Sequence, residues 1–300
     1  ATSYPDDLDA ITLYADALFL LEERRGYRDL TNPRVIRIHN ILEGVLARDV
    51  QHPFACHLYI HATESTTEPG KAEICTEFMG NVIPGASHLN HMPSHTWNEI
   101  GRWGDSVRAN LQAWHTDQKA AFGEGVAIYP THNLQMLLFA ASMDGQGAIA
   151  MQAGKDLSKL NGNSLFQLLT LLRFGRFEEI LQVTERPDAD YPAGVWDFAQ
   201  GYALLKSGET EFARAHLARL GAMADTTEAM FRFDPASRLL SVMHGILEGE
   251  IHWQDGNLRR AIRAFEGAVE NEDLLGYDEP EPLPFAARHW LGAALLETDR

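Results

Sequence analysis

The sequence predicts an all-α protein, a right-handed superhelical solenoid of antiparallel helix pairs. Apolar residues recur at helical spacing along the chain, and no run alternates in the manner of a β-strand. The turns expected between paired helices each contain a glycine. In addition, His57 and His61 recur 34 residues later as His91 and His95, and a period of this length is typical of stacked helix–turn–helix units.

The helices can be placed in order from their first residues and their breaks. Residues 6–23 carry an acidic first turn before the apolar pattern, and prolines at 33 and 53 suit the first position of the next two helices. Thr131 is expected to cap a later helix. The predicted ranges are 6–23, 33–48, 53 to the break at 68–70, 70–81, 87–100, 104–122, 132–143, 148–160, 163–174, 177–185, 193–206, 210–223, 236–253, 257–271 and 284–297.

Composition narrows the class of protein. Hydrophobic residues make up 45% of the 300 residues and charged residues 22%, which is typical of a globular chain. The formal net charge of -17 argues against a nucleic-acid partner. No run of 18 apolar residues is present, so we expect no membrane span and no membrane partner.

The N-terminus and the cysteines bear on location. The first ten residues are acidic and lack both a signal-peptide pattern and a starting Met, so we expect a processed or cut end. Two cysteines make no disulfide framework, and a reducing cytoplasm fits them. Cys56 and Cys75 are therefore expected to pack as core side chains in a cytoplasmic protein.

The turns between the predicted pairs look alike. Gly101, Gly175, Gly208 and Gly256 each stand where a positive φ is needed, and an apolar residue follows within two or three positions to anchor the second helix in most of them. In these turns and in the period of 34 residues, the sequence resembles the tetratricopeptide repeat superfamily, over most of its length. Because the last predicted helix has no partner, we expect residues 1–300 to form one helical repeat domain of a longer protein.

A closer resemblance lies in the histidine motifs. The chain reads H-x-x-x-H-x-x-E from His57 through Glu64, then H-x-x-H-M-P-S-H from His88 through His95, and then His132-Asn133-Leu134. It is similar in these motifs to a set of uncharacterised bacterial tetratricopeptide-like proteins. That resemblance implies a fold and a pattern of residues, and it implies no reaction.

The repeat register that the resemblance implies directs these histidines into one concave groove. With Gly101 and Gly145 as turn glycines, the histidines on the first helices of three adjacent repeats take positions that line the groove in the resembled superfamily. Further along, the same register places apolar side chains there, namely Leu165, Leu169, Leu172, Val195, Phe198, Tyr202 and Leu205. The groove is thus predicted to change from histidine-rich to apolar.

One interpretation of the histidine cluster is a metal site. His57, His61, His91 and His95 would present imidazoles to one divalent transition metal ion (Zn, Fe, Cu or Ni), because residues four apart share a helix face. Glu64, His88 or His132 would complete or support the site, and the carboxylate could bind the ion, orient a ring or act as a general base. No catalytic residue can be assigned, so whether the protein is an enzyme stays open.

The competing interpretation is a polar groove that holds an extended peptide, as an interaction scaffold does, or histidines that simply pack between helices. The choice lies between a pocket for a metal or small ligand and a protein-binding surface. Pro93 affects both interpretations, because a proline inside a helix breaks the hydrogen-bond ladder unless the helix begins there. Tyr277 and the dipeptide Glu279-Pro280 could reach the groove, but a plain turn is the favoured interpretation.

Overall fold

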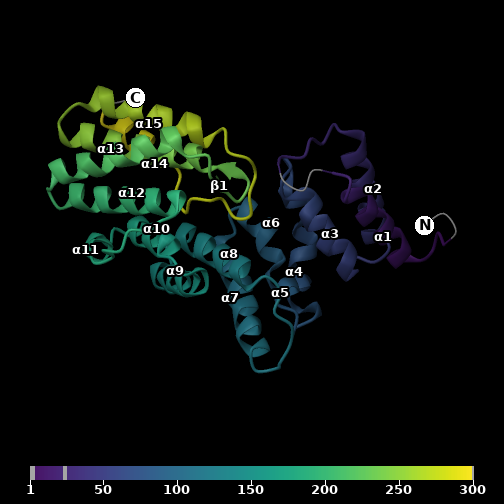
Figure 1. The fold of residues 1–300 in the computed structure, drawn as a ribbon. Coiled ribbons are helices and arrows are strands. Elements are labelled where there is room, and N and C mark those ends of the chain that lie inside the picture. Colours follow the sequence, from purple (N-terminus) through teal and green to yellow (C-terminus); the bar gives the residue numbers. More distant parts are fainter. Residues whose placement is uncertain (1–3, 23–25, 299–300) are drawn as a thin grey trace. The chain divides into compact units, whose positions relative to one another are not determined.

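A computed structural model describes residues 4–22 and 26–298. Its internal contacts divide the chain, expected to be one domain, into two compact units. Unit 1 comprises Ala1–Gly145 and Tyr277–Pro280, and unit 2 comprises Gln146–Gly276 and Glu281–Arg300. Helices make up most of both units, which confirms the all-α class (Figure 1). None of the helices in the described ranges is long and apolar enough to cross a membrane.

Unit 1 carries the histidine motifs on short helices with well-marked starts. Asp7 and Asn32 cap the first two helices by accepting from backbone N–H groups, and His52 caps the third through Nδ1. Pro33 and Pro53 stand at the predicted first positions. Its helices are α1 (Leu8–Phe19), α2 (Pro33–Leu46), α3 (Pro53–Thr63), the 3₁₀ turn η1 (Pro69–Ala72), α4 (Glu73–Val82), α5 (Ser87–His91), α6 (Pro93–Glu99), α7 (Trp103–Ala120) and α8 (Pro130–Met143).

Two local predictions in unit 1 need correction. The single helix predicted over 87–100 is divided into α5 and α6, with Pro93 at the first position of α6. The cap predicted at Thr131 is wrong, because α8 already begins at Pro130 and its capping residue is Tyr129, with φ 59°. Proline fits the first helical turn since its missing N–H would have no partner there, and it thus sets both starts.

The two cysteines of unit 1 are joined, contrary to the expectation of separate core side chains. Cys56 on α3 and Cys75 on α4 form a disulfide with a Cα–Cα distance of 5.3 Å. Both side chains are fully buried, as predicted, in the core shared by α1 to α4. The pairing was missed because the two cysteines are nineteen positions apart in the sequence, and only the packing of α4 on α3 brings them together.

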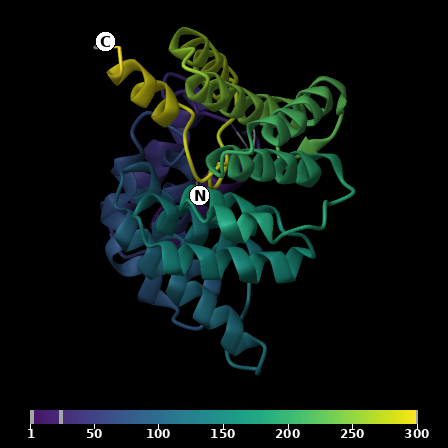
Figure 2. The ribbon, with the colours of Figure 1, turned by 90° about the vertical axis from the view of Figure 1, so that its left-hand side faces the viewer.

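Unit 2 is built from longer helices packed in sequence order. α12, α13, α14 and α15 each pack against the next, and Figures 1 and 2 show them lying alongside one another. Its helices are α9 (Gly147–Asn161), α10 (Leu165–Arg173), α11 (Phe177–Leu181), α12 (Asp190–Lys206), α13 (Thr210–Thr226), α14 (Ala236–Gln254), α15 (Leu258–Glu272) and α16 (Arg288–Leu296). Order and pairing agree with helical repeats, and the superhelical solenoid stays a prediction.

The predicted turn glycines are confirmed in their backbone geometry. Gly101, Gly145, Gly175, Gly208 and Gly256 all have positive φ, between 65° and 88°. One helix ends and the next begins at these turns. A residue adopts positive φ there at little cost in conformational free energy only if it has no Cβ, which favours glycine. The prediction that the protein contains no sheet is wrong in one detail, since β1 (Met230–Phe231) and β2 (Asp234–Pro235) form an antiparallel pair between α13 and α14.

The apolar side chains predicted to line a groove belong to the core of unit 2, although Leu172 and Tyr202 also line a cavity of about 670 Å³ in that unit. All seven belong to one buried cluster, and Tyr202 and Leu172, the most accessible of them, are only 7% exposed. Neighbouring helices pack over the faces on which these side chains stand, because burying that area is what stabilises the helix stack. These residues are Leu165, Leu169, Leu172, Val195, Phe198, Tyr202 and Leu205.

Candidate metal centre

Helix α3 supplies the first two histidines of the site. His57 and His61 stand one turn apart on the same helix face, with ring centroids 5.0 Å apart. The helix ends immediately afterwards, and Glu64 is its C-cap residue. Arg28 secures this end of the helix, since its Nη1 donates to the carbonyl oxygen of His61 at 2.9 Å and to Ser65 Oγ at 2.6 Å.

The junction of α5 and α6 supplies three more histidines. His88 and His91 lie on α5, and His95 lies on α6 beyond Pro93. Met92 between them keeps helical backbone angles, φ -48° and ψ -40°, so the four-residue step from His91 to His95 survives the break. Their rings lie 4.7 Å apart as a result, and the proline does not disperse the motif.

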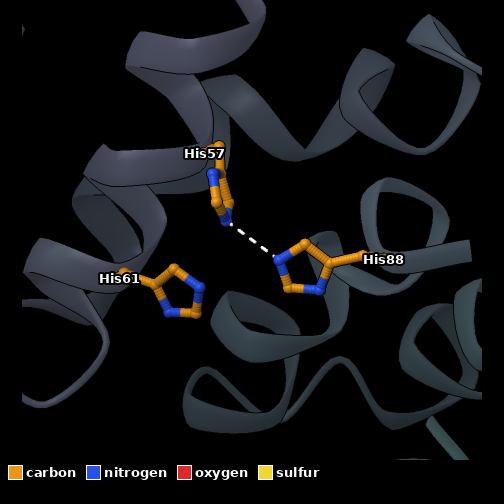
Figure 3. Close-up of side chains that lie close together, drawn as sticks. All are labelled: His57, His61 and His88. Carbon is orange, nitrogen blue, oxygen red and sulfur yellow. Dashed lines mark hydrogen bonds between the residues drawn. The ribbon is translucent and has the colours of Figure 1, made fainter. Parts of the chain in front are cut away.

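A first triad consists of His57, His61 and His88. One ligand atom from each lies within 4.8 Å of the others. Nε2 of His57 and Nε2 of His88 are 3.1 Å apart, and Figure 3 shows the two rings meeting end to end with His61 beside them. Two nitrogens bound to one tetrahedral ion lie about 3.3 Å apart, since each bond is about 2.0 Å long. The separation thus suits a shared ion.

A second triad consists of His91, His95 and His132, the last carried by α8. Its ligand atoms also lie within 4.8 Å of one another. Nε2 of His95 and Nε2 of His91 are 3.3 Å apart, and the ring of His132 is 4.8 Å from that of His91. His91 and His95 are almost completely buried, with 0% and 1% exposed. This triad lies deeper in the unit than the first, whose rings are all partly exposed.

Glu64 connects the two triads. Its Oε1 is 2.7 Å from Nδ1 of His61, and its Oε2 is 2.5 Å from Nδ1 of His95. An ionised carboxylate only accepts hydrogen bonds, so both Nδ1 atoms carry the proton, and Nε2 of each ring remains for an ion. Only 2% of Glu64 is exposed, and a buried carboxylate is stable only with such partners.

The segment Tyr277–Pro280 also belongs to this unit, although it follows α15 in the sequence. Tyr277 is buried and donates a hydrogen bond to Glu64. Glu279 Oε2 is 3.9 Å from Nδ1 of His95, and His61, Glu64, His95 and Glu279 form a third group whose ligand atoms lie within 4.8 Å. The plain turn that the sequence favoured is therefore wrong, because this segment packs against the cluster.

The charges at the site suit metal binding. Burial, followed by the neighbouring imidazoles, lowers the pKa of His57 and His91 well below 6.5 and that of His88 to about 4. These rings are neutral at pH 7, which is the form that binds a metal. Burial by itself would raise the pKa of Glu64, but His95 and His61 outweigh it and lower that pKa well below 4.5.

All seven residues predicted for the metal site lie close together, but they are grouped differently from the prediction. The sequence pattern predicted that His57, His61, His91 and His95 bind one ion. Among the described residues, each triad takes two of these four and adds His88 or His132. Arg28 was not among the predicted residues, and no sequence signal marks it, since it stands on an irregular segment between α1 and α2.

Two cavities in unit 2 contribute no comparable chemistry. One of about 940 Å³ is lined by charged and polar side chains such as Lys155, Arg186 and Asp188. The other, of about 670 Å³, is lined by aromatic side chains, with an ion pair of 2.6 Å between Lys206 and Glu250. None of the three groups that could hold a metal includes a residue from either wall. The candidate site is accordingly the histidine cluster of unit 1.

Comparison with protein-family models finds no match to this sequence, and a search of curated proteins finds none either. The relationship to the tetratricopeptide repeat superfamily accordingly stays a prediction.

Proposed function

We propose that this protein binds a divalent transition metal through the histidine cluster of unit 1. The observation that carries the proposal is the pair of Nε2–Nε2 distances, 3.1 Å between His57 and His88 and 3.3 Å between His91 and His95. Neutral imidazoles at this separation match the edge of a tetrahedral site. An all-nitrogen donor set favours Zn or Cu among the metals that imidazole binds, which also include Ni and Fe.

The surrounding residues support the same function. Glu64 holds Nδ1 of His61 and of His95, which fixes the tautomer and the direction of the two rings. An ion held by three histidines keeps a fourth position for water or a small ligand, the arrangement that metal-dependent catalysis uses. A polar-groove scaffold accounts less well for a carboxylate buried among the rings, since an extended peptide needs accessible donors and acceptors instead.

The direct test is the metal content of the full chain, purified without an affinity tag and measured by elemental mass spectrometry. After treatment with chelator, Zn²⁺ binding is measured by calorimetry. We expect bound metal in the isolated protein, and His95→Gln should weaken Zn²⁺ binding at the triad that contains this ring by more than about 100-fold, since the loss of an orienting partner alone costs about 10–100-fold. His115→Gln, at an exposed position on α7, is the matched control and should bind as the unaltered chain does.

The result that contradicts the proposal is equal Zn²⁺ binding by the two variants and the unaltered chain, or no binding by any of them. An interaction scaffold would then become the better account of the cluster. It would have to use surfaces other than Leu165 and Phe198, because these side chains are buried.

The location of the protein bears on which metal it meets. The cytoplasmic location expected from the sequence stays a prediction. The disulfide between Cys56 and Cys75 weighs against it, because such bonds persist mainly in oxidising compartments.

A further inference from the structure

We propose that the histidine cluster holds two metal ions, one on each triad, with Glu64 as the positioning carboxylate for both. The first triad is His57, His61 and His88, and the second is His91, His95 and His132. This inference rests on the proposed function, since it sets the number of ions and their arrangement at the same site.

The spacing of the six rings argues against a single ion. Six nitrogens around one centre would all lie within about 4.2 Å of one another, which is twice a metal–nitrogen bond. The described rings instead form two groups of three that share no histidine, and the third group combines one ring from each, His61 and His95, with two carboxylates. Three imidazoles are a complete protein ligand set for an ion that keeps an open position. Each triad is therefore sufficient for one ion.

The two triads lie side by side. The ring of His61 is 4.9 Å from that of His95, and the ring of His88 is 5.2 Å from that of His91. These distances between triads fall within the range found inside them, from 4.7 Å between His91 and His95 to 6.3 Å between His61 and His88. Two ions bound here would be close neighbours, and neighbouring ions with open positions can share a small bridging oxygen ligand such as water or hydroxide.

Glu64 ties the triads together chemically. It accepts from Nδ1 of His61 in the first triad and from Nδ1 of His95 in the second. One carboxylate thus directs Nε2 of one ring in each triad toward an ion. Two dications also need nearby negative charge, and Glu64 and Glu279 both lie among the rings, Glu279 Oε2 being 3.9 Å from Nδ1 of His95.

The test is a Cu²⁺ titration of the full chain, stripped of metal, with bound copper measured by dialysis and cupric spins by electron paramagnetic resonance. We expect two equivalents bound per chain. The spin signal should grow with the first equivalent and lose intensity with the second, because neighbouring Cu²⁺ spins couple. One equivalent, or two with a simply doubled signal, would overturn the two-ion inference and leave the proposed function standing. No bound copper would overturn both.

Variants assign the ions to the triads. His57→Gln and His132→Gln should each bind one equivalent with an uncoupled spin signal, whereas the exposed control His115→Gln should keep two coupled ions. If both triad variants still bind two coupled ions, the assignment is wrong.

Glu64→Gln tests the positioning role with a side chain of the same shape. The two carboxylate oxygens each face a different Nδ1, so in glutamine the oxygen accepts from one ring while the NH₂ group faces the other and must donate to its Nδ1, which moves that ring's proton to Nε2. We therefore expect this variant to bind one equivalent strongly, with unchanged helix content by circular dichroism. Two coupled equivalents in Glu64→Gln would show that the carboxylate merely fills space.

Discussion

Lowering the pH should destabilise the metal-free protein well before its carboxylates titrate. His91 is fully buried, and burial lowers its pKa in the folded state well below the 6.5 of an unfolded chain. Between these two pKa values the unfolded state binds more protons than the folded state, so stability falls as the pH falls. His57 and His88 act in the same direction, since burial also lowers their pKa values.

The size of this loss of stability follows from the pKa of histidine in the unfolded chain. At pH 5 an unfolded histidine is about 97% protonated. Each ring that stays neutral in the folded state therefore lowers the free energy of unfolding by about 2 kcal/mol between pH 7 and pH 5. For the three rings the upper limit is about 6 kcal/mol, against a total of about 5–15 kcal/mol for a typical domain. The metal-free protein should therefore be markedly less stable at pH 5 than at pH 7.

The assay is urea unfolding in the presence of chelator at pH 7 and at pH 5, a window that lies above the range of ordinary carboxyl groups. The variant His91→Gln removes one buried imidazole, so its loss of stability between the two pH values should be smaller by about 2 kcal/mol. The exposed control His115→Gln should keep the full loss. Equal losses in His91→Gln and the unaltered chain would refute this reasoning, as would a stability that does not change between pH 7 and pH 5.

Two further outcomes concern stability. Replacing Cys56 and Cys75 together by alanine should lower the free energy of unfolding by about 3 kcal/mol, because the disulfide closes a loop of nineteen residues in the unfolded chain; equal urea midpoints for this variant and the oxidised protein would contradict that. Phe198→Ala should cost about 3–5 kcal/mol in urea unfolding, because the side chain is completely buried, whereas a groove-lining role would leave stability nearly unchanged.

The local features of this protein follow from the sequence alone. Helix starts at Pro33 and Pro53 and positive φ at the turn glycines depend on a residue and its immediate neighbours, so a single chain reveals them. The four-residue spacing of His57 and His61 likewise guarantees a common helix face. The seven candidate metal ligands were predicted from this spacing and from the histidine motifs of the resembled proteins.

Only the tertiary structure decided how these residues combine. The division of the histidines into two triads depends on how α3, α5, α6 and α8 cross, and helix periodicity contains no information about crossing. Tyr277 and Glu279 approach Glu64 and His95 from an irregular segment far along the chain, and the disulfide depends on α4 packing against α3. The apolar residues on α12 around Phe198 illustrate the same limit of sequence-based prediction. Periodicity identifies an apolar helix face, but it cannot say whether a neighbouring helix or a ligand covers that face.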